Sequence, residues 1–239
     1  MFESAELKFI NEETLVVEYG ETLDDRVHKQ VQALDAALMD STVVQHIETL
    51  PTFRSLLIKF DVFSISYDNL LDVLSTLESS NVVLKSQTWH VPICVQGECA
   101  QDLPEVAQEL GISEASIVKI LLNTPLKLYM YGFAPGFAYL GGLDPRLNIP
   151  RRATPRAPMP RGSLMIAGGL ASLSSVAMPT GWYVLGQTPI TMFLPERKPM
   201  VPFAVGDELQ FYEVSIDEFE ILHASGDTAG IDEISNPVA

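Results

Sequence analysis

Cysteine and histidine are scarce in this sequence of 239 residues, and their shortage excludes several kinds of site. Cys94 and Cys99 are the only cysteines, and one C-x4-C pair without a second lacks the four ligands of a structural zinc site. We therefore expect no metal and no disulfide, only buried or surface thiols. The four histidines are scattered and the serines lack a G-x-S-x-G elbow, so the catalytic residues stay unassigned.

Basic residues and long apolar runs are also lacking. Fifteen Lys and Arg stand against 31 Asp and Glu, a formal net charge of −16 that repels nucleic-acid phosphates and anionic lipids. No run approaches the roughly 18 apolar residues that cross a bilayer, and the N-terminus lacks the features of a signal peptide. We expect a cytoplasmic protein with neither a nucleic-acid nor a membrane partner.

The composition that remains is that of a globular protein. Hydrophobic residues make up 47% of the chain and charged residues 19%. The length exceeds the roughly 100–150 residues of a typical domain, so we expect two compact units. Changes in residue composition along the chain predict four segments. They are an N-terminal α/β domain (1–88), a connecting strand with short helices (89–125), a β-barrel domain (126–214) and an acidic C-terminal tail (215–239).

The first segment predicts the order β-α-β-β-α-β of a ferredoxin-like split sandwich. Apolar residues at three- and four-residue steps predict helices over 24–39 and around 70–77. β-rich runs, two of them separated by Pro51, predict strands at 15–19, 43–50, 53–60 and 81–84.

The later segments predict two short helices and then a barrel. Helices are expected over 102–110, stopped by Gly111, and over 113–122, capped by Ser113. The pair could be a DNA-reading motif, but the second helix carries a single basic residue, Lys119, which argues against it. Short apolar segments between Gly and Pro over 126–214 predict a closed or nearly closed barrel, and the acidic tail should end in mobile residues.

A loop rich in glycine and aromatic residues follows the first expected barrel strand. Gly136 and Pro135 restrict the backbone so that Phe133, Phe137 and Tyr139 can be held in one exposed arrangement. Such rings could form a stacking pocket. The alternative is that they fill the mouth of the barrel as core.

Five arginines fall within sixteen residues that contain no acid: Arg146, Arg151, Arg152, Arg156 and Arg161. Guanidinium groups bind carboxylate or phosphate oxygens bidentately, which predicts a small anionic ligand. The alternative is internal pairing with the acidic tail, where 213–233 supplies seven acids and no Lys or Arg. No phosphate-binding glycine motif occurs, so nothing in the residues places a nucleotide on this chain.

Several of these stretches carry a specific family resemblance. Gly132–Leu140, Pro150–Arg156 and Pro160–Ser163 resemble the family of the 5-oxoprolinase B subunit, allophanate hydrolase subunit 1 and the Kip inhibitor, with carboxyltransferase subdomains C and D. The similarity covers nearly the whole chain. It continues through Gly181-Trp182, Gly186, Thr188-Pro189 and Gly206-Asp207, and more weakly through Arg54–Leu56 and Asp102-Leu103.

The resemblance implies an α+β fold with a ferredoxin-like N-terminal domain and a cyclophilin-like C-terminal β-barrel. It implies one component of an ATP-dependent hydrolase of cyclic amide bonds, inactive alone, that works with a carboxyltransferase-domain protein resembling the C subunit on a small anionic or lactam substrate. ATP is implied for the complex. The alternatives are a Kip-type regulator that binds a sensor histidine kinase, or a carboxyltransferase-like partner in a urea-carboxylase-type system.

The sequence departs from the family pattern at positions that could matter for activity. Leu121 stands where the family usually has histidine, and Gln187 replaces the arginine of a Gly-Arg-Thr-Pro motif. We expect aromatic rings to wall the barrel mouth and arginines to hold an anionic group. The ligand-binding residues expected from the loop, the cluster and the resemblance are Phe133, Pro135, Gly136, Phe137, Tyr139, Arg151, Arg152, Arg156, Trp182 and Gln187.

Overall fold

The computed structural model describes residues 5–41, 47–77 and 86–225, and the chain divides into two compact units, 1–85 and 86–239. Each unit has a hydrophobic core of its own. Within the described ranges no helix is both long and apolar enough to cross a membrane.

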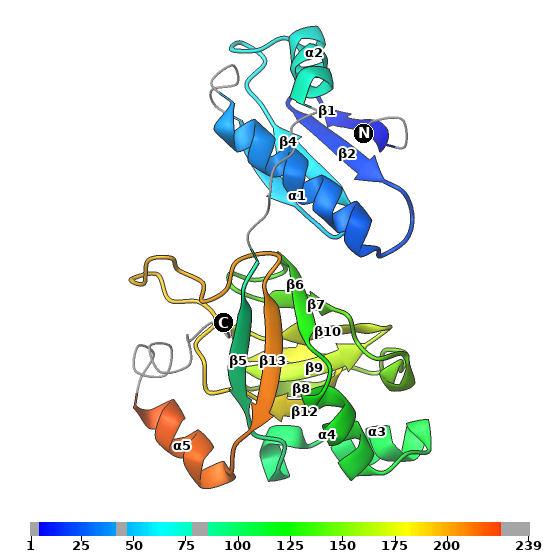
Figure 1. Ribbon diagram of the computed structural model, residues 1–239, viewed down its shortest axis with the longest axis vertical. Coiled ribbons are helices and arrows are strands. Elements are labelled where there is room, and N and C mark those ends of the chain that lie inside the picture. Colours follow the sequence, from blue (N-terminus) through cyan, green and yellow to red (C-terminus); the bar gives the residue numbers. More distant parts are fainter. Residues whose placement is uncertain (1–4, 42–46, 78–85, 226–239) are drawn as a thin grey trace. The chain divides into compact units, whose positions relative to one another are not determined.

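The first unit is a four-stranded antiparallel sheet with two helices (Figure 1). The strands lie in the order β1-β2-β4-β3. Their bounds are β1 (Ala5–Asn11), β2 (Thr14–Tyr19), β3 (Glu48–Pro51) and β4 (Ser55–Lys59), and the helices are α1 (Asp25–Asp40) and α2 (Tyr67–Leu77).

The core of this unit follows from the two-residue repeat of its strands and the 3.6-residue repeat of its helices. Every second residue of β2, beginning at Leu15, is buried, as are Leu56 and Ile58 of β4. The apolar stripes of α1 and α2 join the same cluster, so both helices cover one face of the sheet. Both predicted helices are therefore confirmed.

Two details of the predicted sheet differ. β1 was not expected, since the first predicted strand begins at Leu15, and its residues are mostly exposed in the structure. It pairs with β2, at the position that the fourth strand of a ferredoxin-like sandwich takes; the strand expected at 81–84 lies outside the described residues. Pro51 was expected to break the chain between strands, yet it ends β3, an edge strand, where a missing amide hydrogen is tolerated.

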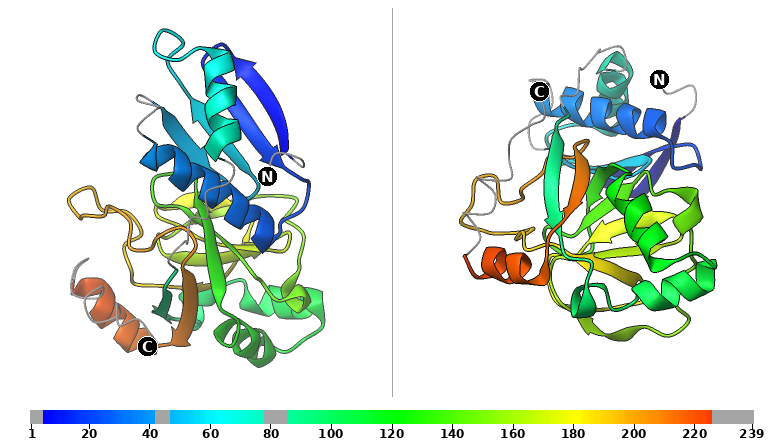
Figure 2. Two further views of the ribbon diagram at one scale, coloured as in Figure 1. Left: turned by 45° about the horizontal axis from the view of Figure 1, so that its top comes forward. Right: turned by 60° about the horizontal axis from the view of Figure 1, so that its bottom comes forward.

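The second unit is built on a seven-stranded sheet in the order β12-β9-β10-β7-β6-β13-β5. Its neighbours are antiparallel except for β13 and β5, which run parallel and side by side (Figure 1 and Figure 2). The strands are β5 (Thr88–Ile93), β6 (Leu126–Tyr131), β7 (Ala138–Gly141), β9 (Ser163–Ala167), β10 (Leu170–Leu173), β12 (Tyr183–Gln187) and β13 (Glu208–Glu213).

The two edges of this sheet meet. Directly after β5, Cys94 pairs with Gln187 at the end of β12, and each backbone amide donates to the other's carbonyl at 2.9 Å. The sheet thus becomes a nearly closed barrel, and the predicted cyclophilin-like fold is confirmed.

Smaller elements complete the second unit. β8 (Arg156–Met159) and β11 (Met178–Thr180) form a two-stranded sheet, and η2 (Gly97–Ala100) and η3 (Pro145–Leu147) are single 3-10 turns. The helices α3 (Leu103–Leu110) and α4 (Glu114–Leu122) were predicted, including the left-handed Gly111 stop and the Ser113 cap. A further helix, α5 (Ile216–Ala224), lies in the segment that was expected to be a tail.

Candidate functional site

The loop between β6 and β7 has a tightly held backbone. Phe133 has a φ of 69°, and the amide of Ala134 donates across it to the Gly132 carbonyl at 2.8 Å, which are the marks of a γ-turn with positive φ. Gly136 has a φ of 72°, and a Cβ atom placed there would lie 2.7 Å from the Met192 carbonyl oxygen. The loop is therefore held by its turn and by a close backbone approach.

Aromatic rings continue from this loop along the outside of the barrel. Ring centroids are separated by 5.5 Å from Phe133 to Phe137, 5.0 Å from Phe137 to Tyr139, and 6.2 Å from Tyr139 to Trp182. The Arg151 guanidinium lies over the Trp182 ring at 5.3 Å. We call these five side chains the aromatic ladder.

The ladder is part core and part surface. Phe137 and Trp182 are buried in a cluster with Met159 and Met165, Tyr139 packs against that cluster, and Phe133 is 74% exposed. The inner rings are core, and the outer ring is presented to solvent.

The arginine cluster resolves into separate contacts. Arg152 and Arg156 both pair with the fully buried Asp102, at 2.8 Å and 2.5 Å, and Arg152 also pairs with Glu105. These carboxylates come from the start of α3 and not from the acidic tail, of which the structure describes 215–225. Arg146 pairs with Asp144 two residues away, and Arg161 donates to Thr191.

Asp102 joins several parts of the second unit. Its Oδ1 pairs with the two arginines, its Oδ2 accepts the Val184 amide at 2.8 Å, and its own amide donates to the Val184 carbonyl at 3.2 Å. Asp102 therefore satisfies both backbone groups of Val184 in β12. It also holds the arginine-rich segment in place through Arg152 and Arg156. The sequence marks Asp102 only as the start of an expected helix and a weak point of family similarity, because its partners lie about 50 and 80 residues away in the chain.

A pocket of about 560 Å³ lies beside β8, within the size range of small-molecule sites. Its polar groups are one guanidinium, one carboxylate and two amides, and the rest of its lining comes from the proline-rich residues of β8 and the proline that follows it. The lining residues are Glu98, Gln101, Arg156, Ala157, Pro158, Met159, Pro160 and Gln187.

Existing hydrogen bonds orient the pocket amides. Gln187 donates its side-chain amide to the Arg161 carbonyl at 2.9 Å, so its side chain is fixed where the family resemblance expects an arginine. Gln101 donates to the Met159 sulfur at 3.2 Å, a weak acceptor that a better ligand acceptor could displace. Met159 also belongs to the cluster under the aromatic ladder, so ladder and pocket share a wall.

The predicted site residues thus fall into three groups. Arg156 and Gln187 line the pocket, whereas Arg152 is held by Asp102 and Glu105. The ladder and its loop hold the others, namely Phe133, Pro135, Gly136, Phe137, Tyr139, Arg151 and Trp182. Of the unpredicted lining, Glu98 and Gln101 lie on and just after η2, a stretch in which the sequence singled out only the cysteines.

Leu121, at the position of the expected family histidine, is buried in the barrel core. Cys94 and Cys99 are buried free thiols, and burial together with hydrogen bonding to Cys94 raises the pKa of Cys99 to about 12. Among the described residues, no three His, Cys, Asp or Glu side chains are grouped as a metal would require.

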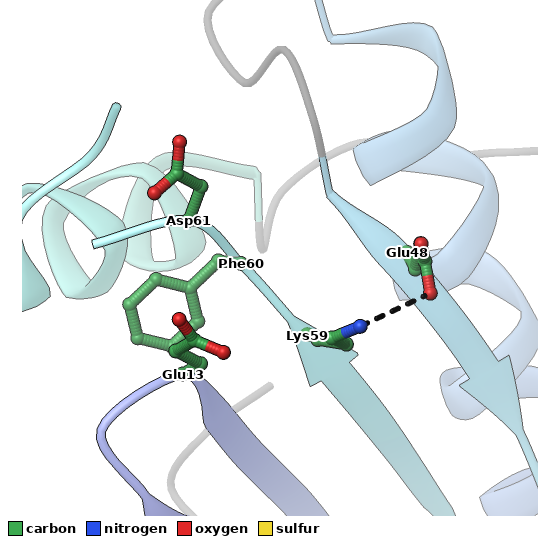
Figure 3. A pocket seen from close by; sticks show the side chains of 5 residues that line it. All are labelled: Glu13, Glu48, Lys59, Phe60 and Asp61. Carbon is green, nitrogen blue, oxygen red and sulfur yellow. Dashed lines mark ion pairs between the residues drawn. The ribbon is translucent and has the colours of Figure 1, made fainter. Parts of the chain in front are cut away.

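The first unit has a smaller pocket of about 220 Å³ (Figure 3). Lys59 and Glu48 form an ion pair across it at 3.9 Å. Asp61 on its rim accepts bonds from the Phe63 amide and the Ser64 hydroxyl, which fix the following turn. These polar groups have structural tasks, and we place the functional site in the second unit.

Comparisons with known proteins agree over most of the chain. The family model described as carboxyltransferase domain, subdomains C and D, matches residues 5–203. The B subunit of 5-oxoprolinase from Bacillus subtilis (strain 168) is 28% identical over 90% of this chain and 95% of its own length. The protein of the same name from Haemophilus influenzae is 32% identical over 66% of this chain and 75% of its own.

Solved structures show the same fold, both within longer chains and as a chain of similar length. TTHA0988 is 26% identical with a TM-score of 0.76, covering 84% of this chain, which spans only 40% of that one. PH0987 from Pyrococcus horikoshii is 29% identical with a TM-score of 0.54, covering 89% of this chain and 99% of its own. The K. lactis urea amidolyase, 20% identical with a TM-score of 0.76, shows the fold alone, and this chain spans 16% of it.

Proposed function

The chain belongs to the family of the carboxyltransferase domain, subdomains C and D, and from that premise we propose that it is the component equivalent to the B subunit in an ATP-dependent 5-oxoprolinase-type amidohydrolase. The observation that carries the proposal is the end-to-end match to a protein named as that subunit of 5-oxoprolinase. Such a component acts together with others, and we propose a carboxyltransferase-domain protein resembling the C subunit as its partner. We call this protein the carboxyltransferase-domain partner.

The pocket beside β8 supports a cyclic amide as the substrate. A lactam presents a carbonyl acceptor and an N–H donor, which suit the Gln101 and Gln187 amides and the Glu98 carboxylate. A carboxylate on the same ring, as in 5-oxoproline, suits the Arg156 guanidinium. This chain's contribution is to bind and orient the lactam.

The same pocket does not suit a nucleoside triphosphate. Its lining holds a single guanidinium and the carboxylate of Glu98, so it offers no surplus of positive charge to a triphosphate. We therefore assign ATP binding to the other components of the complex.

The test is an assay of the assembled complex. The chain is co-purified with the carboxyltransferase-domain partner and the third component from the same genome, and ATP-dependent ring opening of 5-oxoproline is measured. We expect turnover by the complex and none by the chain alone. An intact complex that neither hydrolyses ATP nor opens the lactam would refute the enzymatic proposal.

A matched pair of variants links the activity to the pocket. Gln101→Ala removes a pocket amide and should raise KM roughly two- to tenfold, the effect of losing one hydrogen bond. Gln108→Ala, on the exposed side of α3, should leave KM unchanged. Equal KM values for the two variants would place the substrate elsewhere.

A further inference from the structure

Phe133 is held in a costly backbone conformation. Among the described residues it alone, apart from glycines, has a positive φ. A bulky residue in that region is strained, and strain of this kind persists where the surrounding fold enforces it, often at functional sites. The hydrogen bond across Phe133 and the close approach at Gly136 are what enforce it here.

The strained turn directs an aromatic ring into solvent. The Phe133 ring is 74% exposed and touches the ladder only at its outer end, through Phe137. Stability of this chain would be better served by glycine at this position. A rigidly held aromatic side chain loses little conformational freedom on binding, which favours its use as an anchor in an interface.

A cation is available at the other end of the same ladder. Arg151 is exposed and lies over Trp182, and the described residues give it no carboxylate partner, in contrast to Arg152 and Arg156. Aromatic and arginine side chains dominate the binding energy of protein interfaces. The ladder therefore ends in two groups of the kind that anchor a protein partner.

We propose that Phe133 and Arg151 form the docking surface for the carboxyltransferase-domain partner. Phe133 enters an apolar pocket of the partner, and Arg151 pairs with a carboxylate beside that pocket. The inference rests on the proposed function, which supplies the partner. The inference goes beyond the proposed function by naming the docking surface, which is distinct from the lactam pocket.

Two observations favour this occupant. The fold occurs as a minor part of longer chains, where further residues accompany it in the same chain. The acid-free stretch around Arg151 gives a strongly acidic chain one place at which an acidic partner surface is not repelled.

Binding of the purified partner, measured by calorimetry on the full chain, tests the proposal. We expect Phe133→Ala to weaken binding by about 30-fold or more, the hot-spot range, and Arg151→Ala by about tenfold. Phe63→Ala is the matched control, because Phe63 is a 96% exposed phenyl ring in the first unit. It should change the affinity less than twofold.

A second variant separates docking from folding. Phe133→Gly relieves the strained φ and should raise Tm by roughly 2–4 °C while losing affinity as Phe133→Ala does. A lower Tm would show that the ring is needed for packing and would overturn the proposal.

The remaining outcomes are distinct. If the wild-type chain binds and Phe133→Ala binds equally well, the docking surface is elsewhere and the proposed function stands. If the wild-type chain does not bind the partner, the proposed function fails and the docking surface with it. Self-association abolished by Phe133→Ala would assign the ring to a homodimer and contradict the proposal.

Discussion

Asp102 shows how one buried charge can organise distant segments. The carboxylate is fully buried and engages two arginines and a strand amide, so its interactions compensate the cost of burial. The arginine-rich segment was correctly recognised as unusual from the sequence. Its partners were not, because pairing across about 50 residues depends on the fold and leaves no local pattern.

Removing this carboxylate should destabilise the second unit strongly. Asp102→Ala removes the carboxylate partner of Arg156 and leaves Arg152 with Glu105 alone, and should lower the free energy of unfolding by about 3–5 kcal/mol. Both tryptophans, Trp89 and Trp182, lie in this unit, so urea unfolding followed by tryptophan fluorescence reports on it alone.

The control for this variant is an exposed pair. The Arg146 guanidinium lowers the pKa of Asp144 to about 2, yet the pair lies at the surface. Asp144→Asn should leave the urea midpoint nearly unchanged, since exposed ion pairs contribute little. Similar losses for Asp102→Ala and Asp144→Asn would mean that burial is irrelevant to the Asp102 contacts.

Asp35 on α1 should make the first unit less stable at neutral pH. Burial raises the pKa of Asp35 in the folded state, partly opposed by a hydrogen bond from Thr49. Stability from the protonated form is present below the unfolded pKa, near 3.8, and is lost as pH rises through the folded pKa. Asp35→Asn should therefore raise the Tm of this unit by roughly 2–4 °C at pH 7.

Calorimetry at several pH values checks this expectation. The gain from Asp35→Asn should shrink as the pH falls toward the unfolded pKa near 3.8. Asp72→Asn, at an exposed position in the middle of α2, should show no such dependence. A pH-independent gain would indicate that the substitution acts through packing instead of through ionisation.

At the scale of elements, local signals determined what could be predicted. The caps of α3 and α4 and the stripes of α1 and α2 are encoded within a few residues, and these helices were found. α5 was missed although Ser215 and Glu218 form a capping box at its start, a signal that is readable in the sequence. β1 was missed although Ala5, Leu7 and Phe9 alternate with Glu6 and Lys8, which is also a signal that is readable in the sequence.

The β6–β7 loop should tolerate no side chain at Gly136. Gly136→Ala adds a Cβ 2.6 Å from the Phe193 Cβ on a backbone with positive φ, and should cost about 2–4 kcal/mol from strain and clash together. Gly168→Ala has positive φ and open space, so it measures strain alone and should cost about 1 kcal/mol. Equal losses in urea unfolding would exclude the close approach as a constraint.

At the scale of the whole molecule, the two cores share no residue. One cluster draws only on the first unit, and the others only on the second. Residues 86–239 expressed alone should therefore keep the tryptophan emission and cooperative unfolding of that unit in the full chain. A fragment without cooperative unfolding would show that the second unit needs the first to fold.

The site itself could be predicted only in part from the sequence. The glycine-aromatic loop and the arginine segment were located because each is dense in unusual residues. The pocket was missed as a unit because η2, β8 and the end of β12 contribute to it from separated positions. Only folding brings Glu98 and Gln187 to the same cavity.

The pair of backbone hydrogen bonds that closes the barrel has a consequence for measuring ligand binding. These bonds tie Cys94 to Gln187, and the Gln187 side chain lines the pocket. When the barrel opens transiently at this point, the ends of β5 and β12 separate. A molecule bound in the pocket would hold these two strand ends together. Deuterium uptake at these two amides should slow when the cavity is filled, which gives a readout of occupancy that requires no turnover.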